Sequence, residues 1–391
     1  MRINPPLVAL AIGAFGIGVT EFSPMGMLPG IASDLGVSIP AAGLLVSAYA
    51  LGVLLGAPLM TLTTGRIPRR YLLIGLMGIF TLGNLLSALA TDYYSLLIAR
   101  VVTSLNHGAF FGVGSIVAAS VVAPDKRAGA VAAMFLGLTL ATIGGVPMAT
   151  WFGEVFGWRT AFGGITGLGV LAMVALWFAL PDVPLPKSDG VLAEIRILAR
   201  GPVLAALALT VIGSSAMFTV FTYIAPILRS ETQASTSFVT AMLVLYGIGL
   251  TLGNMWGGKA ADRSVDRTLI VSLGVLILVL LVFTVLMRWP LPAGVAILIW
   301  GMASFAIVPP LQMRVMEAAR EAPNLASAVN IGAFNLGNAA GAALGGAVIK
   351  AGLGYPAVSL AGAAMAGLGL LMVLGLAWRS RAMASAVACR C

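Results

Sequence analysis

Residues 49–70 read YALGVLLGAPLMTLTTGRIPRR, an apolar run punctuated by glycines that ends in three arginines. Shifting the numbering by 197 reaches a second copy of this pattern. The matching residues are Tyr49 and Tyr246, Gly52 and Gly249, Gly56 and Gly253, Arg66 and Arg263, and Arg70 and Arg267. An offset of half the chain is too long for a solenoid and indicates two homologous halves. In a very apolar chain, this organisation is typical of transporters built from two six-helix bundles.

The composition indicates a membrane protein. The chain has 391 residues, of which 60% are hydrophobic and only 9% charged, whereas a soluble domain carries about 25% charge. A membrane span needs about 20 apolar residues, so twelve spans would use roughly 240 and leave short loops. The net charge of +9 does not predict nucleic-acid binding, because the basic residues sit at the ends of the apolar runs, where they set orientation.

The hydropathy pattern predicts an all-α membrane protein of twelve spans in two pseudo-symmetric bundles. The expected spans are residues 7–28, 41–63, 72–90, 95–117, 130–151, 160–180, 203–228, 237–257, 269–287, 293–311, 326–349 and 357–377. We expect bundles at 1–180 and 203–378, a cytoplasmic linker at 181–202 and a cytoplasmic tail at 379–391. Within the linker, residues 191–199 can form a short interfacial helix. Cys389 and Cys391 are interpreted as reduced tail residues, not a disulfide or a metal site.

The distribution of basic residues predicts that both termini are cytoplasmic. With this orientation the outer segments hold only Arg159, Arg229, Arg288 and Lys350 of the 22 Lys and Arg residues. Arg100 lies inside a span, and the others fall on the inner side, as the positive-inside rule requires.

The spans differ in polarity. The third, sixth, ninth and twelfth are almost wholly apolar and are predicted to face lipid. Polar residues gather in the first, fourth, seventh, tenth and eleventh, which must face a partner or a wet cavity. We expect the first, fourth, seventh and tenth spans to line a central cavity.

Three ionisable side chains lie inside spans: Glu21, Arg100 and His107. Each costs about 2.5–3.5 kcal/mol at the bilayer centre on insertion scales, so a functional role is the first hypothesis. The alternatives are structural: Glu21 satisfied by nearby hydroxyls, Arg100 extending to the headgroups, and His107 packed and hydrogen-bonded. We interpret the three as candidates for proton coupling, because a histidine titrates near neutral pH.

Two further groups of residues are predicted to act in transport. The candidate cytoplasmic gate consists of Arg66, Arg69, Arg70, Gly258, Asp262, Arg263 and Arg267. Its alternative interpretation is a set of topology anchors. Glycine and proline in the fifth span are predicted to form a surface where the halves slide, or an ordinary small-residue packing face; these residues are Gly137, Gly144, Gly145 and Pro147.

Candidate contacts with a substrate combine aromatic and amide side chains. They are Asn106, Phe110, Phe111, Phe218, Tyr223, Gln312, Asn335 and Asn338. Aromatic side chains suit ring-containing or amphiphilic molecules, whereas amides suit sugars. The sequence therefore leaves both substrate classes open.

Several motifs resemble the major facilitator superfamily, and more narrowly its bacterial drug:proton and sugar-efflux antiporters, including arabinose-efflux-type permeases. The resemblance covers essentially the whole chain. It is carried by TEFSPMGMLPGIA (20–32), SAYALGVLLGAPL (47–59), TGRIPRR (64–70), LNHGAFFGVGS (105–115), GLTLATIGGVP (137–147) and GWRTAF (157–162).

The resemblance implies functional roles for particular residues. Arg100 matches the fourth-helix arginine that takes part in proton coupling in related antiporters. The loop motif departs from the family pattern in its first copy, which has Thr61 and Gly65 where glycine and aspartate are usual, while Gly258, Asp262 and Arg263 keep it in the second copy.

We therefore expect a monomeric transporter of the bacterial inner membrane that exports a small organic compound, drug-like or sugar, in exchange for protons. The alternatives are a facilitator or proton symporter working in uptake, and a membrane receptor or assembly factor on a similar scaffold. The sequence contains no metal-ligand spacing, nucleophile motif or phosphate-binding loop. Neither an enzymatic activity nor a cofactor is expected, and the partners are substrate, protons and lipid.

Overall fold

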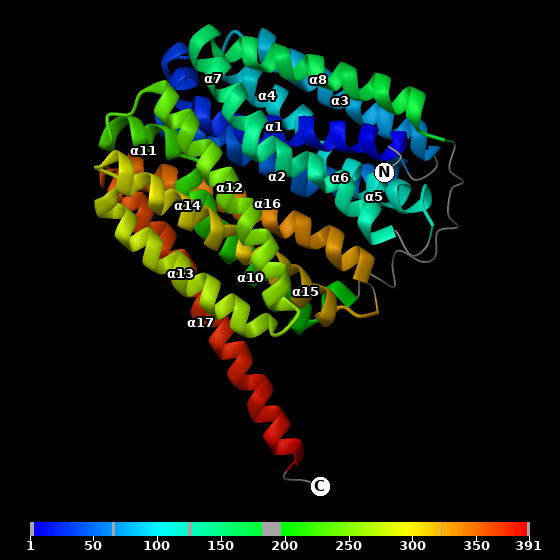
Figure 1. The fold of residues 1–391 in the computed structure, drawn as a ribbon, viewed down its shortest axis with the longest axis vertical. Helices are drawn as coiled ribbons and strands as arrows, with labels where there is room; N and C mark the ends of the chain where they lie inside the picture. Colours follow the sequence, from blue (N-terminus) through cyan, green and yellow to red (C-terminus); the bar gives the residue numbers. More distant parts are fainter. Residues whose placement is uncertain (1–3, 65–66, 124–126, 182–196, 322, 389–391) are drawn as a thin grey trace. The chain divides into compact units, whose positions relative to one another are not determined.

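The computed structural model describes residues 4–64, 67–123, 127–181, 197–321 and 323–388, and their regular elements are helices (Figure 1). They are α1 (Pro5–Asp34), α2 (Ile39–Thr64), α3 (Arg69–Leu89), α4 (Tyr93–Ser104), α5 (His107–Ser120), α6 (Arg127–Leu140), the π-helix η2 (Ala141–Gly145), α7 (Val146–Phe156), α8 (Trp158–Ala179), α10 (Gly201–Phe221), α11 (Ile224–Glu231), α12 (Thr236–Ala261), α13 (Val265–Leu286), α14 (Pro290–Ala306), α15 (Val308–Ala318), α16 (Pro323–Lys350) and α17 (Tyr355–Ala388).

Eleven helical segments of the described residues are long and apolar enough to cross a membrane. They correspond to all the expected spans except the eleventh. That span is α16, a helix of 28 residues that would extend about 42 Å. Twelve spans and cytoplasmic termini remain predictions. At the C-terminal end, α17 continues through residues 379–388, which the sequence analysis expected to be a tail (Figure 1).

Several expected spans are interrupted helices. The fourth breaks between Ser104 and His107, the seventh between Phe221 and Ile224, and the tenth at Ile307. The fifth contains η2 between α6 and α7. Non-helical backbone at membrane depth is tolerated only where it is buried in protein or lines a wet cavity. The fourth, seventh and tenth are three of the four spans expected to line the central cavity.

The internal repeat appears in the packing of the glycines that define it. A Cβ atom at Gly56 would lie 3.0 Å from the Leu105 Cα, at the break between α4 and α5. In the second copy, a Cβ atom at Gly253 would lie 2.8 Å from the Cα of Met302 in α14. Leu105 and Met302 are themselves 197 positions apart. The offset found in the sequence therefore relates packing contacts as well as residue types.

The described chain divides into two compact units. The first comprises Met1–Gly190 with Phe221–Gly247, and the second comprises Val191–Val220 with Ile248–Cys391. The first unit thus includes α11 and the beginning of α12, which belong to the second sequence repeat. The expected bundle boundaries at 1–180 and 203–378 refer to the repeat and remain a prediction. Most of the expected interfacial helix at 191–199 lies outside the described residues.

The core of the first unit is apolar and lies among α1, α3, α5 and α8. Exposed leucines and valines cover the other side of α3 and α8, for example Leu82 and Leu171, as expected for helices that face lipid. The third span nevertheless differs from the expectation in one respect. Its buried face carries Asn84 and Ser87, both fully enclosed, so α3 is not apolar around its whole circumference.

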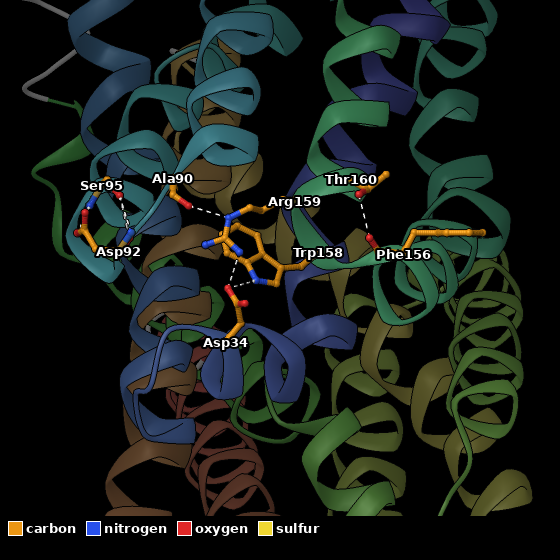
Figure 2. Close-up of polar contacts among 8 residues, drawn as sticks. All are labelled: Asp34, Ala90, Asp92, Ser95, Phe156, Trp158, Arg159 and Thr160. Atoms are coloured by element: carbon orange, nitrogen blue, oxygen red, sulfur yellow. Dashed lines mark hydrogen bonds and ion pairs between the residues drawn. The ribbon is translucent and has the colours of Figure 1, made fainter.

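The segment GWRTAF forms a polar clasp at the predicted outer end of the first unit (Figure 2). Gly157 joins α7 to α8 with a positive φ of 91°, a conformation that favours glycine. Next to it, the Trp158 indole donates a hydrogen bond to Asp34 at 3.1 Å. Arg159 pairs with the same carboxylate and donates from Nε to the Ala90 carbonyl at 2.8 Å. The clasp therefore fastens the ends of α1, α3 and α8 together.

Candidate functional site

The first unit brings the three intramembrane ionisable residues together. The Glu21 carboxylate on α1 lies 3.9 Å from His107 Nδ1, on the first residue of α5. The Tyr49 hydroxyl on α2 lies 3.1 Å from the same nitrogen. Glu21, Arg100 and His107 are 4%, 1% and 5% exposed, so none extends to an aqueous surface in this structure.

Arg100 is held without a carboxylate within ion-pair distance among the described residues. Its Nη1 donates to the backbone carbonyl of Thr20 at 2.9 Å and to the Thr20 hydroxyl at 3.3 Å. Its Cζ lies 4.3 Å from the centroid of the Tyr49 ring, a cation–π distance. Nε and Nη2 have no hydrogen-bond partner among the described residues. These two N–H groups form the edge of a guanidinium that can bind a carboxylate through two hydrogen bonds.

Asn84 completes this cluster and was not identified from the sequence. Its side-chain oxygen accepts a hydrogen bond from the Thr20 hydroxyl at 2.5 Å. The only sequence signal was an amide inside an otherwise apolar span, and the apolar residues around it predicted a lipid-facing helix. Thr20 thus connects α3 to the Arg100 side chain.

The break in the fourth span determines where His107 lies. Because α4 ends at Ser104 and α5 begins at His107, the imidazole starts a new helix beside Glu21. Asn106 between them is fully buried, and neither its amide nitrogen nor its amide oxygen has a partner among the described residues. A helix N-terminus favours negative charge within its first turn. The N-terminus of α5 can therefore stabilise the carboxylate form of Glu21, which is the form that remains after its proton is released.

The aromatic candidates in the first unit occupy packed positions. Phe110 is enclosed against Gly13 of α1. Phe111 stacks on Phe135 with ring centroids 5.1 Å apart and also lies 5.2 Å from His107. Tyr223 packs against Gly43 of α2. The role of all three as substrate contacts remains a prediction.

In the second unit, an amide network joins α10, α15 and α16. Gln312 donates to the Ser327 hydroxyl at 2.6 Å, and Asn330 donates to the Gln312 oxygen at 2.6 Å. The Thr210 hydroxyl donates to Asn330 at 2.7 Å. Gln312 was a candidate from the sequence, whereas its hydrogen bonds to Ser327 and Asn330 were not predicted.

The other candidates of the second unit lie elsewhere on α10 and α16. Phe218 is edge-on to Phe334, with ring centroids 5.5 Å apart. Asn335 donates to the Ile331 carbonyl at 3.0 Å, while the side-chain oxygens of Asn335 and Asn338 are buried without a partner among the described residues. Their contact with substrate remains a prediction.

The candidate gate residues have separate surroundings. Arg66 lies outside the described residues. Arg70 donates to the Trp177 carbonyl at 2.6 Å and lies over its ring. In the second copy, Asp266 pairs with Arg314 at 2.9 Å, whereas Asp262 is exposed within its unit. A gating role for Asp262 stays a prediction, as it does for the remaining members, Arg69, Gly258, Arg263 and Arg267.

Two of the three glycines predicted to act in the fifth span pack against α1. A Cβ atom at Gly137 would overlap the Ala11 carbonyl, and one at Gly145 would overlap Val19. Gly144 has open space, and Pro147 is buried at the start of α7. These contacts are consistent with small-residue packing, while sliding at this surface remains a prediction.

The first unit also contains an ion pair that the sequence did not predict. Arg229 on α11 pairs with Glu154 on α7 and donates to the Thr236 hydroxyl at 3.1 Å. Nearby, the rings of Phe22 and Phe221 have centroids 6.2 Å apart. The segment 221–247 of the second repeat is therefore fastened to α1 and α7 of the first.

An all-helical chain with an internal repeat and ionisable side chains buried within apolar spans has the features of a multi-pass membrane transporter. Residues 10–332 match the family described as the Major Facilitator Superfamily, and the chain belongs to that family. Among the described residues, no group of three or more His, Cys, Asp or Glu could hold a metal ion.

Known proteins support this assignment. The inner membrane transport protein YdhP of Escherichia coli (strain K12) is 60% identical over 373 residues, which cover 95% of this chain and 96% of the relative. A "Probable sugar efflux transporter" of Helicobacter pylori (strain P12) is 31% identical over 367 residues, covering 94% and 93%. The crystal structure of a D-xylose-proton symporter has the same fold, with a TM-score of 0.77 at 16% identity over 96% of this chain and 97% of that one. The chain is therefore a multi-pass transporter of small solutes in the bacterial inner membrane, not an enzyme.

Proposed function

We propose that the protein exports a small organic compound in exchange for protons, by alternating access of one substrate site to the two sides of the membrane. The observation that carries the proposal is the enclosed cluster of Glu21, His107 and Arg100. Glu21 is the carboxyl that takes up and releases the proton. The open Nε and Nη2 edge of Arg100 offers its deprotonated form a second partner.

An inward proton gradient supplies enough free energy for such an exporter. One pH unit and about 100 mV together provide about 3.7 kcal/mol per proton. One proton can therefore maintain a few-hundred-fold gradient of a neutral solute, at about 1.4 kcal/mol per tenfold. This coupling requires that proton and substrate exclude each other at the site.

A substitution at Glu21 tests the coupling. A growth screen of an efflux-deficient host on toxic compounds and sugars first identifies a transported compound. Glu21→Gln is then expected to abolish gradient-driven export of that compound in vesicles while leaving its exchange at equal pH largely intact. Wild-type accumulation by Glu21→Gln would show that another group carries the proton. His107→Asn is expected to change the pH dependence or the apparent substrate affinity.

A proton symporter working in uptake is the second candidate, because a protonatable cluster serves either direction. The Helicobacter pylori relative is named a probable sugar efflux transporter, which favours export and a sugar-like substrate. Right-side-out and inverted vesicles under the same pH gradient distinguish the two. If substrate accumulates in the vesicles while protons leave them, the protein is an exchanger. If substrate and protons enter the vesicles together, it is a symporter.

A further inference from the structure

Asn84 is a buried amide with a defined orientation. Its nitrogen donates to the Phe80 carbonyl of its own helix at 2.9 Å, and its oxygen accepts from the Thr20 hydroxyl on α1 at 2.5 Å. Exchanging the two amide atoms would place two acceptors against each other at Phe80. The oxygen therefore faces α1. Burying an amide is unfavourable unless it is hydrogen-bonded, and here both ends are satisfied.

The Thr20 hydroxyl behaves differently from other threonines in these helices. Thr81, Thr103 and Thr219 each donate to the carbonyl four residues earlier, at 2.7 Å, a common arrangement for a hydroxyl inside a helix. Thr20 instead donates its only proton across to Asn84. This bond fixes the rotamer of the hydroxyl, and in this position its oxygen accepts a hydrogen bond from Arg100 Nη1 at 3.3 Å.

Thr20 is the residue that anchors the Arg100 guanidinium by hydrogen bonds. The Nη1 group donates to its carbonyl and hydroxyl, while Nε and Nη2 have no partner in the described part of the chain. The aromatic face of Tyr49 restrains the position of the cation perpendicular to the ring. Glu21 follows Thr20 directly in the sequence. Thr20 therefore fixes the position of Arg100 relative to Glu21.

We propose that Asn84 is a positioning residue, which fixes the Arg100 guanidinium near Glu21, beyond ion-pair distance, by orienting the Thr20 hydroxyl. This inference rests on the proposed function of Glu21 as the proton-carrying carboxyl. Without the Asn84 oxygen, the Thr20 side chain rotates so that its hydroxyl donates to the Gly16 carbonyl one turn earlier. The rotation carries the oxygen away from Arg100, and the cation loses one of its acceptors. Moving the cation away from Glu21 makes the carboxyl bind its proton more tightly, because a nearby positive charge favours the ionised form.

The other charged groups around α1 do not replace Arg100. Tyr49 on α2 and His107 on α5 are the titratable side chains that interact with Glu21, together with Arg100 on α4. Glu154 on α7 pairs with Arg229 on α11, and Arg159 on α8 pairs with Asp34. The remaining ionisable residues on the packed elements lie at helix ends: Arg69, Arg70 and Tyr71 on α3, Tyr93 and Tyr94 on α4, Arg127 on α6, and Glu231 on α11.

The test requires no substrate. Infrared difference spectroscopy of the purified, full-length protein in lipid follows a protonated buried carboxyl as the pH changes, and the band that is lost in Glu21→Gln belongs to Glu21. Asn84→Ala is expected to shift the midpoint of this band to higher pH by about one unit, which corresponds to about 1.4 kcal/mol. Ser87→Ala is the matched control, because Ser87 is equally buried on α3 and its hydroxyl bonds its own helix at Gly83.

Substitutions at Thr20 guard against a general loss of structure. Thr20→Val is expected to reproduce the shift, Thr20→Ser to keep the wild-type midpoint, and the double variant Asn84→Ala with Thr20→Val to shift no further than either alone. A midpoint in Asn84→Ala equal to that of Ser87→Ala, or additive shifts in the double variant, would overturn the inference. Export by Glu21→Gln at the wild-type level would instead contradict the proposed function, so the two failures are distinguishable.

Discussion

Glu154 and Arg229 form an ion pair in the first unit although they come from different sequence repeats. Their equivalents at the 197-residue offset are Ala351 and Ala32, so the pair has no counterpart related by the repeat. Around it, Phe221 lies against Phe22, and Leu243 lies against Gly26. If the repeats rock against each other during transport, these contacts must separate when the predicted outer end opens.

Breaking this ion pair is expected to open the predicted outer end. In a chain with Cys389 and Cys391 replaced by serine, Leu243→Cys introduces a thiol at a position that is 2% exposed. Adding Glu154→Gln is expected to speed its labelling by an impermeant maleimide about tenfold, equivalent to about 1.4 kcal/mol, since Arg229 loses its carboxylate. The measurement is the labelling rate in whole cells.

Two control variants test whether a change in the labelling rate results from loss of the Glu154–Arg229 ion pair. Glu231→Gln removes a different carboxylate, on the same helix as Arg229, and should leave the rate unchanged. Exchanging the charges with Glu154→Arg and Arg229→Glu should restore slow labelling. Equal rates in all variants would mean that the ion pair does not limit opening.

The clasp at Asp34 is expected to contribute to stability. Asp34→Asn weakens the hydrogen bonds from Trp158 and Arg159, which lie at a partly exposed site, so we expect a loss of about 1 kcal/mol. The melting temperature in detergent should fall by about 1–2 °C. Arg288→Gln, at an exposed arginine, serves as control. An unchanged melting temperature in Asp34→Asn would show that the clasp is energetically neutral.

The two aspartates of the second loop motif should have separable effects. Asp266 is paired with Arg314 inside its unit, so Asp266→Asn should lower the melting temperature. Asp262 is exposed, and Asp262→Asn should instead impair transport with little change in stability. Gly65→Ala, at the equivalent position of the first copy, should be mild. Transport losses of similar size in Asp262→Asn and Gly65→Ala would show that the loop motif only sets the orientation of the chain in the membrane.

The Arg200–Glu321 pair predicts a pH dependence of stability. Both oxygens of Glu321 accept hydrogen bonds from Arg200, at 2.8 and 2.9 Å. This hydrogen bonding holds the pKa of Glu321 below its ordinary value of 4.5. A lowered pKa stabilises the folded state above about pH 4.5, and that contribution disappears as the pH falls through the folded-state value.

The melting temperature of Glu321→Gln should therefore be slightly lower than that of the wild type at pH 7, and this difference should vanish in acid. Because both side chains are at least half exposed, added salt should also reduce the difference. Melting curves at pH 7 and below pH 4, with and without salt, measure it. A difference that persists in acid would attribute the effect to packing rather than to charge.

The sequence alone determined the class of the protein. Long apolar runs, basic residues at their ends and a repeat at 197 positions are properties of the chain itself, and each span must satisfy its backbone internally in lipid. The same reasoning selected Glu21, Arg100 and His107, because an ionisable side chain inside a span is expensive wherever its neighbours lie. The sequence did not predict a role for Asn84, because a single amide barely changes the hydropathy of an apolar helix.

Only the tertiary structure decided which of these residues meet. Whether Thr20 faces Asn84 or its own helix depends on how α1 and α3 are rotated and how closely they approach. The break at residues 105–106 turns His107 toward Glu21, and no local signal predicted it. Glu154 and Arg229 are 75 residues apart, and their pairing follows from the docking of residues 221–247 on α1 and α7. Whether two side chains meet depends on how their helices are rotated about their axes and how far apart the helices lie. The hydropathy of the sequence contains no information about either quantity.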